Sequence, residues 1–141
     1  MTPDQQLASL TAAFLRSARG LAGFGWLLCL IAGLGALDAA MHGNTLVLLL
    51  HALALACGFA LAWQSLRMRF DIAAFELIAR DEGPALANFD LALKRLGLRD
   101  GSDVRALEQR AAATRKMVTR LALIVLLEFL LVLAGLLTRH A

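Results

Sequence analysis

Three stretches of this sequence are apolar and almost free of charged residues over the length of a membrane-spanning helix. A helix needs about 20 consecutive apolar residues to cross the hydrocarbon layer of a bilayer. The apolar residues form long runs here, whereas a soluble helix carries them as a stripe on one face. The sequence therefore predicts an all-α membrane protein with three transmembrane helices, at residues 20–40, 45–66 and 118–138.

The composition agrees with this class of protein. Hydrophobic residues make up 60% and charged residues 18% of the chain, whereas soluble domains average about 45–50% apolar and about 25% charged residues. The three histidines are scattered, and the two cysteines lie inside apolar runs, where a cysteine is ordinarily a small packing residue. We expect no enzyme activity, no metal and no cofactor. The lack of a basic patch with interleaved aromatic residues argues against nucleic-acid binding.

The first residues have the pattern of a helix start. Thr2 is suited to the N-cap, Pro3 to the first helical position, and Gln5 to closing a capping box. Apolar residues then recur at helical spacing at Leu7, Leu10, Phe14 and Ala18. This pattern predicts an amphipathic helix over residues 1–19, which either lies in the headgroup region or continues into the first transmembrane helix.

The segment between the second and third predicted transmembrane helices, residues 67–117, has helical periodicity as well. Gly83 and Pro84 are expected to end the helix that leaves the membrane, because proline continues helices poorly. Gly97 is expected to end a second, short amphipathic helix. We therefore predict a helical hairpin with a short helix at its tip. The whole chain, residues 1–141, is then a single membrane domain.

Arginine placement predicts the orientation of the chain. The segment from Arg67 to Arg120 holds eleven of the fourteen basic residues, and the turn between the first two predicted spans holds none. The positive-inside rule places such a segment in the cytoplasm. The N-terminus is then cytoplasmic and the C-terminus periplasmic. The bias toward Ala, Leu and Arg suggests the inner membrane of a bacterium.

Glu128 interrupts the third predicted transmembrane helix near its middle. A carboxylate at that depth costs about 2.5 kcal/mol or more on insertion scales, so such residues usually face the protein interior. Glu128 shares a helical face with Gly135 and with the flanking Thr114 and Thr138. We expect it to point inward, either as a proton relay, an ion site or an anchor for a partner helix, or as a neutral packing group.

His51 is the second intramembrane polar candidate, on the same face of its predicted helix as Asn44 and Gly58. Counted from the periplasmic helix ends, its depth differs from that of Glu128 by about 6 Å, which two side chains can bridge. A His51–Glu128 pair is one hypothesis. The other is a histidine satisfied by a backbone carbonyl or a water. We expect no haem, because no second well-placed intramembrane histidine is present.

Small residues recur every four positions in the first two predicted spans, and such stripes let membrane helices approach closely. The candidate packing residues are Gly25, Cys29 and Gly33 in the first span, and Ala54, Gly58 and Ala62 in the second. The second span has a further stripe at Ala52, Ala56 and Ala60. One of its two stripes is therefore expected to remain available for another subunit.

These features favour a non-catalytic subunit or adaptor of a membrane complex, whose partners are lipid and either another membrane protein or further copies of this chain. A first alternative is a transport or ion-coupling component that uses Glu128 with His51. A second alternative is a membrane-active or immunity-type small protein. The sequence resembles no family that would decide among the three.

Overall fold

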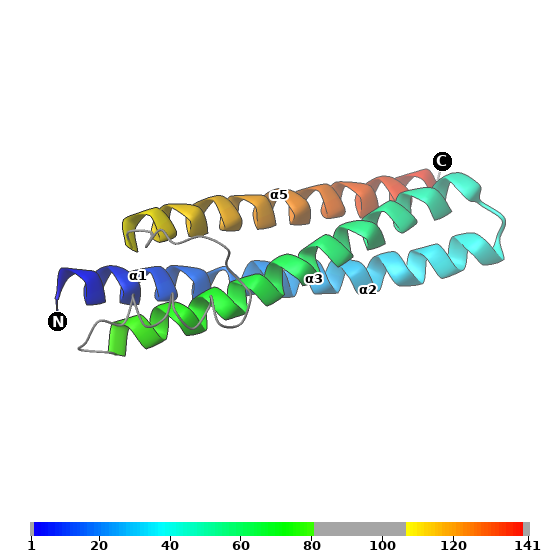
Figure 1. Cartoon of the computed structure of the whole chain (residues 1–141). Coiled ribbons are helices and arrows are strands. Elements are labelled where there is room, and N and C mark those ends of the chain that lie inside the picture. The colour runs from blue at the N-terminus through cyan, green and yellow to red at the C-terminus, as the bar shows by residue number, and fades with distance from the viewer. Residues whose placement is uncertain (1, 81–106, 140–141) are drawn as a thin grey trace, which may run out of the picture. The chain divides into compact units, whose positions relative to one another are not determined.

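The computed structural model describes residues 2–80 and 107–139, all of them in helices or short turns (Figure 1). The helices are α1 (Pro3–Ser17), α2 (Arg19–Met41), α3 (Thr45–Arg80) and α5 (Leu107–Arg139). Three helical segments, Pro3–Met41, Thr45–Arg80 and Ala111–Arg139, are long and apolar enough to cross a membrane, and the most apolar stretch of each has a mean hydropathy of 2.0, 2.3 and 2.7, respectively. For the described residues, the predicted all-helical class is confirmed, with three helices long and apolar enough to span a membrane.

Two of these helices are longer than the roughly 20 residues that a bilayer core requires. The helix α3 continues past residue 66 to Arg80, and α5 begins at Leu107, before the predicted span at 118–138. Both extensions agree with the helical periodicity in the sequence of the 67–117 segment. Gly83, Pro84 and Gly97, which were expected to shape the tip of the hairpin, lie outside the described residues.

The chain divides into two compact units, which we treat separately. The membrane unit consists of residues 18–67 and 117–139, and so contains α2 with the apolar parts of α3 and α5. The N-terminal unit consists of α1 with the remaining parts of α3 and α5.

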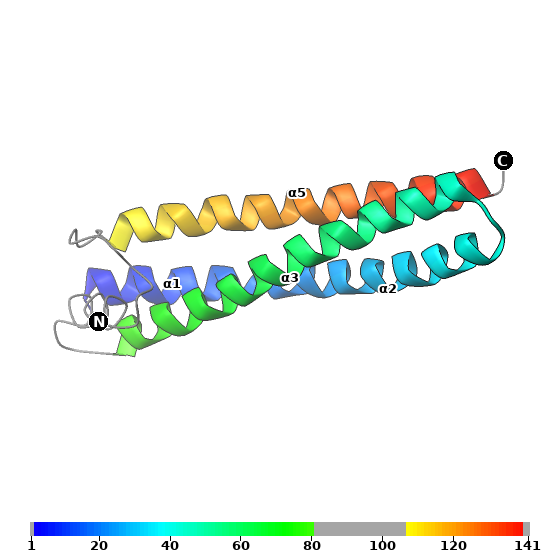
Figure 2. The same cartoon turned by 45° about the vertical axis from the view of Figure 1, so that its right-hand side comes forward.

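In the membrane unit, α2 and α3 are antiparallel and α5 runs in the same direction as α2 (Figures 1 and 2). A short turn joins α2 to α3, as the sequence predicted. Gly43 has φ +70 there, a left-handed conformation that glycine adopts without strain. The Asn44 amide donates to the Ala39 carbonyl at 3.0 Å, and the His42 amide donates to the Asp38 carbonyl at 3.1 Å. These bonds satisfy carbonyls that the end of α2 would otherwise leave free.

Small side chains lie where the three helices of the membrane unit meet. Ala32, Ala54 and Val132 form a buried cluster with one residue from each helix. A Cβ atom added to Gly25 would lie 2.6 Å from Leu61 Cδ2 and 3.2 Å from Val125 Cγ2. Close approach of this kind matters in lipid, where helices associate through packing and not through the hydrophobic effect.

The predicted capping box opens α1 in the N-terminal unit. The Thr2 amide donates to Gln5 Oε1 at 2.8 Å, and the Gln5 amide donates to Thr2 Oγ1 at 3.3 Å. Within the predicted apolar stripe of α1, Leu10 and Phe14 are 69% and 44% exposed. The buried residues are Ala8, Thr11, Ala12 and Leu15.

The rest of the N-terminal unit combines an apolar interior with a surface ion pair. The apolar residues that α3 buries in this unit are Met68, Ile72, Phe75 and Ile78. Arg16 of α1 binds Glu76 of α3 through two nitrogens, with Nη2 at 2.6 Å and Nε at 3.0 Å from the same Oε1 atom. This contact ties the last turn of α1 to α3.

Candidate functional site

Glu128 is fully buried in the membrane unit, with 0% of its surface exposed. It lies on the inner face of α5, in register with Leu121, Val125 and Val132, which are also buried. Outward positions of this helix are occupied mainly by leucine. The expectation that Glu128 points inward therefore agrees with its place in the structure.

Cys29 of α2 is the hydrogen-bond partner of this carboxyl. Its thiol donates to Glu128 Oε1, with Sγ and Oε1 2.9 Å apart. The second carboxyl oxygen, Oε2, is buried and has no hydrogen-bond partner among the described residues. Glu128 is thus held on one side only.

Gly58 of α3 makes room for this pair. A Cβ atom at position 58 would collide with Cys29 Sγ and would lie 4.0 Å from Glu128 Oε1. Each of the three helices therefore contributes one residue: a thiol from α2, a glycine from α3 and a carboxyl from α5. We call Cys29, Gly58 and Glu128 the carboxyl site.

His51 of α3 is the second buried polar side chain of the membrane unit, at 1% exposure. Its Nδ1 lies 2.8 Å from the carbonyl oxygen of Val47, one turn earlier. Because a carbonyl only accepts hydrogen bonds, Nδ1 carries the proton of this bond. The imidazole lies between Gly35 and Gly135, and a Cβ atom at either glycine would collide with the ring. Its Nε2 has no partner among the described residues.

The structure does not pair His51 with Glu128. Gly58 lies beside Glu128 and Gly135 lies beside His51, so the two polar side chains differ in level by the seven residues from His51 to Gly58 on α3. Seven residues rise by about 10.5 Å, more than the depth difference expected from the sequence. The expected difference was obtained by counting residues from the ends of the apolar runs. The ends of these runs do not show how two antiparallel helices are shifted along their axes relative to each other. His51 instead bonds to a backbone carbonyl through Nδ1, as in the second of the two hypotheses, while its Nε2 has no partner among the described residues.

The small residues flagged in the sequence occupy different environments. Gly25, Ala54 and Gly58 are buried, and Cys29 and Ala62 are half-buried. Gly33 is different, because nothing lies within 4 Å of the position of an added Cβ atom. The close approach two residues further on, at Gly35, was missed because Gly35 does not continue the four-residue spacing.

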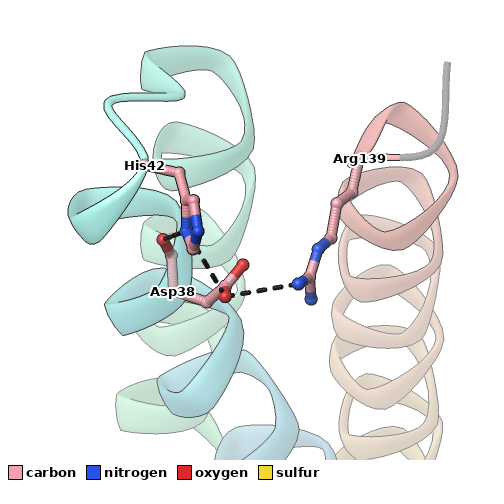
Figure 3. A network of polar contacts seen from close by, with 3 residues as sticks. All are labelled: Asp38, His42 and Arg139. Carbon is pink, nitrogen blue, oxygen red and sulfur yellow. Dashed lines mark hydrogen bonds and ion pairs between the residues drawn. The ribbon is translucent and has the colours of Figure 1, made fainter.

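A polar network lies at the end of the membrane unit next to the α2–α3 turn (Figure 3). Arg139 Nη2 of α5 lies 3.3 Å from Asp38 Oδ1 of α2. His42 Nδ1 lies 2.9 Å from the Asp38 carbonyl oxygen and 3.5 Å from Oδ1. Sequence reasoning treated these residues only as ends of apolar runs. The sequence did contain an indication of this pair. Asp38 and Arg139 lie at the ends of the first and third predicted spans, and these two spans are predicted to run in the same direction.

The chemistry available to this arrangement is narrow. Within the described residues no group of three or more His, Cys, Asp or Glu side chains could hold a metal ion. Cys29 and Cys57 are free thiols and half-buried. The carboxyl site contains one buried carboxyl group and one thiol donor. Such a carboxyl can bind a proton and, once protonated, can donate a hydrogen bond.

Comparison with known proteins finds no matching protein family, no matching curated protein and no matching solved structure.

Proposed function

We propose that this protein is a non-catalytic subunit or adaptor of a membrane complex, and that the outer face of α3 binds a transmembrane helix of another subunit. The supporting observation is the exposure of Ala52, Ala56 and Ala60 in the membrane unit. These alanines form a small-residue stripe along the apolar part of α3, and such stripes favour close helix–helix contact. The other stripe of α3, with Ala54 and Gly58, is used within the chain.

The outer face of α5 has a different character. Its exposed large residues are Leu123, Leu126, Leu127, Phe129, Leu130, Leu133, Leu136 and Leu137. Branched side chains of this size resemble lipid tails and give no groove for a second backbone. On α3, by contrast, the alanines lie among large side chains such as Phe59 and Trp63, which are 81% and 66% exposed. This contrast supports α3 as the partner-binding helix and α5 as a lipid-facing helix.

The proposal includes a location and an orientation. The chain resides in the inner membrane of a bacterium with its N-terminus in the cytoplasm and its C-terminus in the periplasm. The support is the concentration of basic residues between Arg67 and Arg120. In this orientation the N-terminal unit lies on the cytoplasmic side.

A matched pair of substitutions tests the proposed interface. Ala56→Leu places a larger side chain on the α3 stripe, and Ala122→Leu makes the same change at an exposed position of α5. After purification in mild detergent, we expect Ala56→Leu to reduce the co-purified subunit by about tenfold, equal to about 1.4 kcal/mol. Ala122→Leu should leave it unchanged.

Two differently tagged copies of the chain, expressed together, identify the occupant. Co-purification of both tags indicates a second copy, and a single tag with another membrane protein indicates a hetero-complex. Equal recovery of the partner with both leucine variants would refute the interface on α3. Circular dichroism and gel filtration of each variant verify that the helices remain folded.

A further inference from the structure

The second oxygen of Glu128 is a buried acceptor without a hydrogen-bond partner among the described residues. Oε1 accepts the Cys29 thiol, whereas Oε2 has no partner among the described residues. An ionised carboxyl in apolar surroundings is strongly disfavoured unless something neutralises it. The neutralising group at Oε2 therefore has to be a cation or a proton.

A metal cation does not fit the groups present. Hard cations such as Na⁺, Mg²⁺ and Ca²⁺ require several oxygen ligands, commonly six or so. The carboxyl site supplies one carboxyl and one thiol, and the described residues contain no group of three metal-binding side chains. A proton needs a single lone pair, which Oε2 provides.

No charged side chain of the membrane unit lies level with Glu128 in the described part of the chain. Two other titratable groups of α2 and α3 lie near Glu128. Cys29 of α2 is in contact with its carboxyl, and Cys57 of α3 precedes Gly58 in the same helix. His51 lies two turns away along α3 and bonds to Val47. On α5 itself the nearest basic residue toward the N-terminus is the exposed Arg120. Among the described residues, no side chain supplies a counter-ion that could replace the proton on Glu128.

We propose that Glu128 is a reversible proton-binding site inside the membrane unit, with Cys29 as the residue that positions its carboxyl. The thiol holds Oε1, and Oε2 takes up a proton to give the neutral acid and releases it to give the carboxylate. No bond other than O–H forms or breaks. Gly58 is part of the site because only glycine leaves space for the thiol to reach the carboxyl.

An apolar carbodiimide tests this proposal on the full-length protein. Dicyclohexylcarbodiimide partitions into apolar regions and reacts with a carboxyl that carries a proton, leaving a stable adduct that peptide mass spectrometry locates. The labelling rate is measured from mildly acidic to mildly alkaline pH and corrected for the pH dependence of the reagent itself. We expect Glu128 to be labelled, and its labelling to fall with rising pH along a single titration curve. A water-soluble carbodiimide should instead label the half-exposed Asp38.

Three variants test whether the label is on Glu128 and whether Cys29 affects its titration. Glu128→Gln should lose the adduct at this position and no other. Cys29→Ala should move the pH of half-maximal labelling, because it removes the hydrogen bond to Oε1, whereas Cys57→Ala should leave that pH in place. Absence of labelling at Glu128 throughout the pH range would overturn the proposal. Labelling that does not titrate would also overturn it, because it would show a permanently protonated packing group.

Discussion

Gly35 and Gly33 lie two positions apart on α2, yet the structure gives them opposite roles. A side chain at Gly35 would collide with the imidazole of His51, which is fixed by its bond to Val47. A side chain at Gly33 would meet nothing within 4 Å. At this scale the sequence revealed that small residues are abundant in the spans. It could not reveal which of them face a neighbouring helix, because that depends on how each helix is rotated about its axis.

These two glycines provide a matched test of the packing. We expect Gly35→Ala to lower the free energy of unfolding by about 1–3 kcal/mol, since the added methyl group forces a fixed ring to move. Gly33→Ala should raise it by about 0.5–1 kcal/mol, because alanine favours a helix over glycine. Denaturant titration in detergent, followed by circular dichroism, measures both. Equal effects of the two substitutions would show that His51 is not packed against α2.

Glu128 allows a second prediction at the scale of a single residue. Glu128→Leu removes a buried polar group and replaces it with an apolar one, a change that is often neutral or stabilising. We expect it to preserve folding, with a change of less than about 1.5 kcal/mol. Glu128→Gln should preserve folding as well, because the amide oxygen still accepts the Cys29 thiol. A loss of the folded state in both variants would mean that the carboxyl itself holds the bundle together.

At the scale of elements, the helices of the membrane unit were predictable and the packing of α1 was not. Apolar run length fixed the three spans, and continued periodicity indicated that α3 and α5 leave the membrane as helices. In α1 the large apolar residues Leu10 and Phe14 are exposed, and the structure buries the neighbouring face of small residues with Leu15. Hydrophobicity alone does not identify the packed face of a helix that also has Leu10 and Phe14 on its outside.

The packing of α3 in the N-terminal unit leads to a prediction about this element. Phe75 is 4% exposed and Leu77 is 63% exposed, although they lie only two residues apart. Phe75→Asp should loosen the N-terminal unit, because a buried charge without a partner costs several kcal/mol. Leu77→Asp places the same charge at the surface and should have little effect. Limited proteolysis compares them: faster cleavage within residues 68–80 is expected for Phe75→Asp alone, and similar rates would contradict the burial of Phe75.

At the scale of the whole molecule, the central claim is that the chain crosses the membrane three times. An odd number of crossings places the two termini on opposite sides. The arginine distribution predicts the direction, with the 67–117 segment on the side of the N-terminus. Composition and run length were sufficient to predict three helices long and apolar enough to span a membrane, because the bilayer imposes the same length on every spanning helix.

Reporter fusions measure this claim most directly. A pair of reporters is used, one active only in the cytoplasm and the other only in the periplasm, and each is placed after His140 and, separately, near Gly101. We predict periplasmic activity after His140 and cytoplasmic activity near Gly101. The same compartment at both positions would contradict the third crossing, and the reversed pattern would contradict the orientation.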